Sequence, residues 1–154
     1  MEETIEQRLM RLGIELPQAA APAANYAPYV ASGNLLMTAG QLPLADGAFV
    51  ATGRLGADVG IEAGQAAARA CAINLLAQAK AALGDLDRLK RIVKINVFVA
   101  SAPDFTDQHL VANGASDFLA EAIGDRGIHA RSAIGVAALP LNAAVEIDAV
   151  FEIG

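Results

Sequence analysis

The chain is 154 residues long, which suits a single domain with one buried core. Its composition is 55% hydrophobic and only 18% charged, an apolar excess that we attribute to surfaces buried between the subunits of an oligomer. The net charge of −6 argues against a nucleic-acid-binding protein, because such proteins neutralise phosphates with a broad basic surface.

The first part of the chain predicts a short helix, a connector and a group of strands. Residues 4–12 have apolar side chains at helical spacing, with Thr4 and Gln7 placed to form a capping box. The Ala- and Pro-rich residues 18–24 predict an extended connector, since proline interrupts a helix. Short strands separated by Gly-containing turns are expected next and are interpreted as one meander: residues 29–32, 35–40 and 48–51.

The second part predicts two long helices and three strands. The longest helix, residues 58–83, lacks proline and stops before Gly84, and the other, residues 107–123, stops before Gly124. Strands are expected over residues 92–100, 130–139 and 143–153. The strand 92–100 is so apolar that we expect cover on both of its faces, from helices or from a second subunit. This order indicates an α+β fold, a mixed sheet with both helices on one face.

Several features exclude further classes of site. No stretch approaches the roughly 20 apolar residues of a membrane span, and the first residues do not resemble a secretory signal, so we expect a cytoplasmic protein. With one cysteine and two histidines, we predict no disulfide and no metal site. Cys71 is expected to be a small buried apolar side chain. The basic cluster of Arg88, Lys90, Arg91 and Lys94 is interpreted as a solvated loop between a helix and a strand.

Arg131 and Glu146 are the residues that the sequence marks for function. Each lies in a predicted strand that is otherwise rich in Val, Ile and Ala. A guanidinium and a carboxylate in such strands either pair with each other or bind a charged ligand, and the residues leave both alternatives open. A ligand carboxylate would accept two parallel hydrogen bonds from the arginine. A glutamate in apolar surroundings could act as an acid or a base.

Separate segments of the chain together resemble a known family. They are APYV at 27–30, MTAGQLP at 37–43, VKINVFV at 93–99, ARS at 130–132, LP at 139–140 and VEI at 145–147. In this order they resemble the reactive-intermediate deaminases of the YjgF type, also named endoribonuclease L-PSP, over about residues 22–153. The resemblance implies a chorismate-mutase-like α+β subunit, a homotrimer with a central barrel, and ligand clefts between subunits.

The resemblance also implies roles for particular residues. Arg131 would hold the carboxylate of a small substrate, and Glu146 would take part in the chemistry of the attacking water. Tyr29 and Gly40 would line the same cleft, with Asn113 close to it. The chain would be one domain, residues 1–154, in which residues 1–16 add an N-terminal helix to a core of residues 17–154.

Two positions beside the arginine depart from the family pattern. His129 and Ala133 stand where many members have proline and cysteine. We expect these exchanges to alter the wall of the cleft.

The leading functional hypothesis is a hydrolase of the 2-iminobutanoate/2-iminopropanoate deaminase type. It would convert reactive enamines and imines of amino acids to 2-oxo acids and ammonia without a cofactor. A second hypothesis is a regulatory trimer that binds small 2-oxo acids without catalysis. A third, the endoribonuclease of the family's other name, is ranked low, since the acidic chain offers little for RNA to contact.

Overall fold

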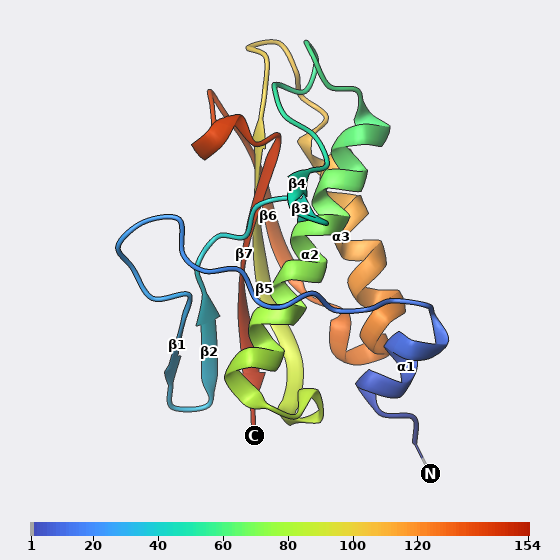
Figure 1. The fold of residues 1–154 in the computed structure, drawn as a ribbon. Coiled ribbons are helices and arrows are strands. Elements are labelled where there is room, and N and C mark those ends of the chain that lie inside the picture. The colour runs from blue at the N-terminus through green and yellow to red at the C-terminus, as the bar shows by residue number, and fades with distance from the viewer. Residues whose placement is uncertain (1) are drawn as a thin grey trace.

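A five-stranded sheet with two long helices on one face forms the body of the molecule (Figure 1). The computed structural model describes residues 2–154, so Met1 of the predicted N-terminal extension lies outside the described residues. The helices are α1 (Ile5–Arg11), α2 (Ile61–Leu83) and α3 (Gln108–Ile123). The strands are β1 (Tyr29–Ser32), β2 (Leu35–Thr38), β3 (Leu44–Ala45), β4 (Ala48–Phe49), β5 (Leu89–Ala100), β6 (Ala130–Val136) and β7 (Val145–Ile153).

The sheet is mixed, with strand order β1-β2-β7-β5-β6. Only β5 and β6 run parallel, and α3 supplies the crossover that a parallel pair requires. The register places Arg131 of β6 beside Ile95 of β5, and Glu146 of β7 beside Phe98 of β5. The predicted α+β fold with both long helices on one face is therefore confirmed.

Small side chains let α2 lie close to the sheet and to α3. Ala67, Ala68, Cys71 and Ala72 of α2 are all buried, as the sequence led us to expect for Cys71. The Cys71 thiol donates to the carbonyl of Val145 at 3.6 Å, and burial raises its pKa well above the usual value. A thiol in this position is not an available nucleophile.

Gly114 allows the closest approach between α2 and α3. A Cβ atom there would stand 2.7 Å from the carbonyl carbon of Gln65 and would overlap the carbonyl oxygen. We therefore expect Gly114→Ala to lower the free energy of unfolding by about 1–3 kcal/mol, since neither helix backbone can move freely. Gly60→Ala is the control in urea denaturation, because a Cβ at Gly60 meets no atom within 4 Å. Equal losses in the two variants would contradict this account.

The N-terminal helix is built as the sequence predicts. Thr4 Oγ1 accepts from the Gln7 amide, and Gln7 Oε1 accepts from the Thr4 amide, so the capping box is present. Ile5 and Leu9 are buried, and α1 packs beside the end of α3 (Figure 1). None of the helices within residues 2–154 combines the length and the hydropathy needed to cross a bilayer.

Two interpretations of the sequence are wrong. The expected meander is instead a β1-β2 hairpin in the main sheet and a separate ribbon of β3 and β4. The basic cluster is not a loop: β5 begins at Leu89, so Lys90, Arg91 and Lys94 belong to the strand. These side chains are exposed because no helix covers the second face of the sheet, and charged residues are solvated there.

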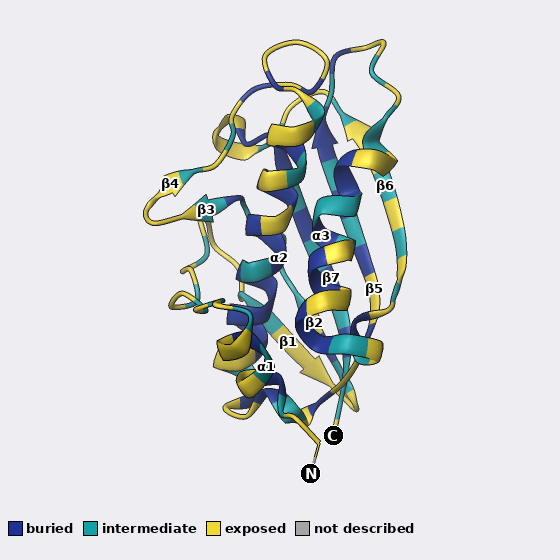
Figure 2. Ribbon diagram, turned by 90° about the vertical axis from the view of Figure 1, so that its right-hand side faces the viewer, coloured by how far each residue is buried: buried dark blue, intermediate teal, exposed yellow. Residues whose placement is uncertain are grey.

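We call the uncovered face of the sheet the open face. Helices do not supply the expected cover of β5 there, and cover by a second subunit stays a prediction. That strand lies between β7 and β6, but helices cover only one of its sides. Val30, Met37 and Ile134 are 57%, 46% and 48% exposed. Figure 2 shows β6 as a largely exposed edge beside the buried strands. Part of the apolar excess in the composition is therefore made up of side chains that are exposed on the open face and at the β6 edge.

Candidate functional site

Arg131 is held in place by three acceptors, all of them neutral. Its Nη1 donates to Asn113 Oδ1 at 2.9 Å and to Ser116 Oγ at 3.0 Å, and its Nη2 donates to the carbonyl of His109 at 2.8 Å. All three acceptors belong to α3. Asn113 and Ser116 are three residues apart, so they lie on the same side of the helix. The half-buried guanidinium is therefore oriented without being neutralised.

The remaining donors of Arg131 suit a carboxylate. These contacts use three of the five N–H groups of a guanidinium and leave the Nε–H and one Nη2–H. Within residues 2–154, Arg131 forms no ion pair with an acidic side chain. Arg131 and Glu146 of the same copy therefore do not form a salt bridge within the described residues, and two N–H donors of Arg131 remain for an anionic group.

His129 extends the network around the arginine. Its Nε2 lies 2.8 Å from Ser116 Oγ, and its Nδ1 lies 2.6 Å from the carbonyl oxygen of Gly127. Burial, together with the nearby Arg131 charge, lowers the pKa of His129. A hollow of about 310 Å³ beside the network is lined by Ser116, Ala120, Gly127, Ile128, His129 and Arg131.

Glu146 lies at a second hollow, of about 350 Å³. Its walls are mostly apolar and come from residues 20–24, Tyr26, Pro28, Leu42 and Leu141, with Gly40 beside the carboxylate. Burial, and secondarily the Asp148 carboxylate, raise the pKa of Glu146 above 4.5. A Cβ atom at Gly40 would stand 2.7 Å from the Glu146 carboxyl carbon, so a larger residue there would displace the Glu146 side chain from this position.

Arg131 and Glu146 occupy opposite faces of the sheet. Arg131 pairs with Ile95, which is buried under the helices, and its contacts are all on α3. Glu146 pairs with Phe98 and alternates with Val145 and Ile147, which are buried on the helix side, so it projects from the open face. Neither hollow described above contains both residues.

The five residues predicted for the site thus form two groups and one outlier. The first group is Arg131 with Asn113, which are hydrogen-bonded, and the second is Glu146 with Gly40, which lies beside its carboxylate. Tyr29 lies on β1 and packs against the core, while Tyr26 lines the Glu146 hollow. Ser116 was missed by the sequence analysis, although its spacing from Asn113 on a predicted helix could have revealed it.

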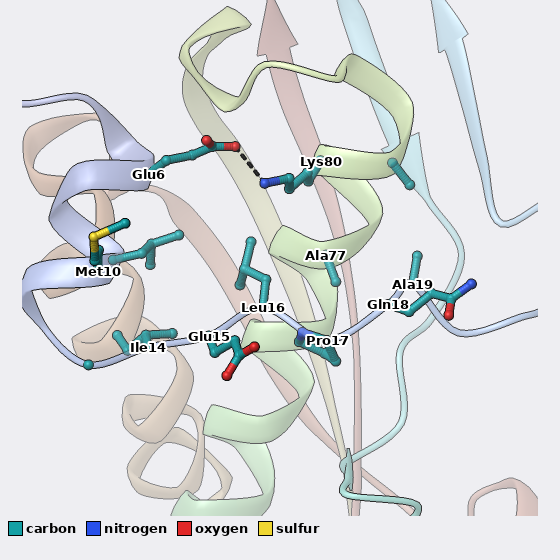
Figure 3. A pocket seen from close by; sticks show the side chains of 13 residues that line it. Glu6, Met10, Ile14, Glu15, Leu16, Pro17, Gln18, Ala19, Ala77 and Lys80 are labelled. Atoms are coloured by element: carbon teal, nitrogen blue, oxygen red, sulfur yellow. Dashed lines mark hydrogen bonds and ion pairs between the residues drawn. The ribbon is translucent and has the colours of Figure 1, made fainter.

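A larger hollow of about 750 Å³ lies away from both groups. It is bounded by α1, by residues 13–19 and by α2 around Ala77 and Lys80, and the Glu6–Lys80 ion pair of 2.7 Å crosses its rim (Figure 3). It includes none of the residues that the sequence marked for function. Residues 2–154 contain no cluster of three or more His, Cys, Asp or Glu side chains placed to share a metal ion.

Comparisons with known proteins agree with this architecture. Protein TCP17 of Trypanosoma cruzi is 57% identical over 150 residues, which cover 97% of this chain and 94% of that protein. A crystal structure of a protein of unknown function from Agrobacterium tumefaciens is 54% identical, with a TM-score of 0.90 over 97% of this chain and 92% of its own. A crystal structure of E. coli TdcF with bound serine is 25% identical, with a TM-score of 0.62 over 90% of this chain and 93% of its own.

A family model matches almost the whole chain. It is described as "YjgF/chorismate_mutase-like, putative endoribonuclease", and it matches residues 6–152. The match includes Gly40 and the parts of α3, β6 and β7 that carry Asn113, Arg131 and Glu146. The chain therefore belongs to the YjgF/chorismate-mutase-like family.

Proposed function

We propose that the protein is a cofactor-free hydrolytic deaminase acting on enamine and imine intermediates of amino acids, with 2-iminobutanoate as a representative substrate. The observation that carries this proposal is the oriented Arg131 guanidinium, which keeps two N–H donors for a carboxylate. The serine bound to E. coli TdcF supports it, since serine carries the carboxylate and the nitrogen-bearing carbon that such a substrate would present.

The reaction needs few groups because an imine already reacts with water. Water adds to the carbon of the C=N bond, and the resulting carbinolamine loses ammonia to leave the C=O bond of a 2-oxo acid. Arg131 would fix the substrate carboxylate, which positions the reacting carbon. Glu146 would accept a proton from the attacking water and return it to the departing nitrogen. A pKa raised by burial makes its carboxylate a stronger base than an exposed glutamate.

We infer further that the site is assembled from two copies of the chain. Arg131 lies on the helix side of the edge strand β6, whereas Glu146 projects from the open face. Packing the edge of one copy against the open face of another would bring the two groups together and would cover Val30, Met37 and Ile134. The homotrimer with a central barrel is the arrangement that the family resemblance implies, and light scattering of the purified protein tests it.

The proposed activity is tested with freshly generated 2-iminobutanoate, by following the release of 2-oxobutanoate above the uncatalysed rate. We expect acceleration by the wild-type protein and its loss in Arg131→Ala. No acceleration by a folded, oligomeric wild-type protein would overturn the proposal.

The second candidate function is a regulatory trimer that binds 2-oxo acids without catalysis. The favouring observation is that the carboxylate anchor of Arg131, Asn113 and Ser116 is complete within one chain, while Glu146 is remote from it. Saturable binding of 2-oxobutanoate without imine hydrolysis would select this function.

The endoribonuclease hypothesis would gain support only from RNA cleavage that copurifies with the protein and disappears in a point variant.

A further inference from the structure

We propose that His129 acts through Ser116 as a positioning residue for the Arg131 guanidinium. This inference rests on the proposed role of Arg131 as a carboxylate anchor. It concerns His129, a residue that the proposed reaction does not use.

The direction of each hydrogen bond follows from the chemistry of the acceptors. The carbonyl oxygen of Gly127 can only accept, so Nδ1 of His129 carries the ring proton in the 2.6 Å contact. In neutral histidine the other nitrogen, Nε2, is then an acceptor. The Ser116 hydroxyl must therefore donate to Nε2 at 2.8 Å. Burial and the Arg131 charge both disfavour the imidazolium, which keeps His129 in this neutral form near neutral pH.

When the Ser116 O–H points at His129, the Ser116 oxygen is left as a hydrogen-bond acceptor for Arg131. With its hydrogen directed at His129, the oxygen presents lone pairs to Nη1 of Arg131 at 3.0 Å. Asn113 Oδ1 accepts from the same nitrogen at 2.9 Å, so both Nη1 hydrogens are engaged. The guanidinium plane is then set, and its Nε–H and second Nη2–H are not used by these contacts to α3. Three consecutive hydrogen bonds thus connect the Gly127 carbonyl to Arg131 through His129 and Ser116, and we call this series the relay.

Gly127, at the start of the relay, is held in place by close packing. Gly127 is buried, and a Cβ atom there would stand 2.8 Å from the carbonyl carbon of Leu119 on α3. The carbonyl that orients His129 thus belongs to a turn packed against the same helix that carries Ser116. The competing explanation for His129 is direct contact between its ring and a ligand. The geometry disfavours it, because both ring nitrogens are already hydrogen-bonded within the chain.

Two measurements test the relay. Imidazole ¹⁵N NMR at pH 7.5 is expected to show Nδ1 protonated and Nε2 unprotonated, with the Nε2 signal shifted in Ser116→Ala. Calorimetric titration with 2-oxobutanoate is expected to show about three- to tenfold weaker binding in His129→Leu, the effect of one neutral hydrogen bond. His129→Gln should recover most of the affinity, because Gln Oε1 can accept from Ser116.

The variants separate a relay from a general loss of packing. Ser116→Ala with His129→Leu should bind no more weakly than Ser116→Ala alone, since the second change acts through the first. Asp117→Asn, at an exposed position of α3, is the control and should bind as wild type does. Additive losses in the double variant, or no rescue by His129→Gln, would overturn the relay.

The NMR result decides the inference even if the proposed function fails. Should the wild-type protein not bind 2-oxobutanoate, the carboxylate anchor is refuted, while the tautomer of His129 and the Arg131 Nε signal still report on the relay. A protonated Nε2 in the wild-type protein, or an Arg131 Nε signal unchanged by Ser116→Ala, would refute it.

Discussion

Arg131→Ala is expected to weaken the binding of 2-oxobutanoate by at least about 100-fold, with a matching loss in kcat/KM for 2-iminobutanoate. The guanidinium would donate two charge-assisted hydrogen bonds to the carboxylate, each worth about 1.5–3 kcal/mol. Their loss corresponds to roughly two orders of magnitude or more in the dissociation constant. Arg131→Lys should recover little, because an ammonium cannot reproduce the paired donors or the contacts to Asn113 and Ser116.

The control for this prediction is Arg54→Ala. Arg54 is an exposed arginine away from the Arg131 network, so its removal changes the net charge equally and leaves the anchor intact. Calorimetry gives the dissociation constants, and circular dichroism verifies that each variant is folded. Binding by Arg131→Ala that equals binding by Arg54→Ala would show that the anchor lies elsewhere.

Glu146→Gln is expected to lower kcat by about 100- to 10,000-fold while binding of 2-oxobutanoate persists. An amide of the same shape cannot accept the proton of the attacking water, but it leaves Arg131 unaltered. In the wild-type protein, kcat should fall as the pH falls through the raised pKa of Glu146, since only the carboxylate acts as a base. A value of kcat close to that of wild type would remove Glu146 from the chemistry.

The same variant should be more stable than the wild-type protein at pH 7. Burial and Asp148 raise the pKa of Glu146 in the folded chain above 4.5, so the unfolded chain ionises first as the pH rises. The wild-type protein therefore loses stability between about pH 4.5 and the folded pKa, and it keeps that penalty at higher pH. Thermal unfolding should give a higher Tm for Glu146→Gln at pH 7 and no difference well below pH 4.5, with Glu152→Gln on the same strand as control.

The sequence was sufficient to predict the helices, and the family resemblance pointed to one hydrogen-bond partner of Arg131. Gly84 and Gly124 marked the ends of α2 and α3, because both adopt positive φ values at the helix termini. The association of Asn113 with the site was implied by the resemblance, and in the structure its side chain contacts Arg131. Periodicity alone would not have paired these residues, since they come from a helix and a strand separated by a turn.

The separation of Arg131 from Glu146 could not be predicted in the same way. Which face each residue occupies depends on the register of β6 and β7 against β5, and the loop between β6 and β7 breaks the alternation that links them. The start of β5 was missed for a related reason. Its charged residues resemble a loop unless one knows that one face of the sheet lacks helices.

We propose that Arg131 of one copy and Glu146 of another act on the same substrate. Joint refolding of Arg131→Ala and Glu146→Gln chains tests this shared site, because each variant is expected to have little activity alone. If sites form between copies, random mixing in equal amounts should restore about one quarter of the wild-type deaminase activity, from sites that receive both intact side chains. Mixed oligomers that remain as inactive as the separate variants would contradict the claim.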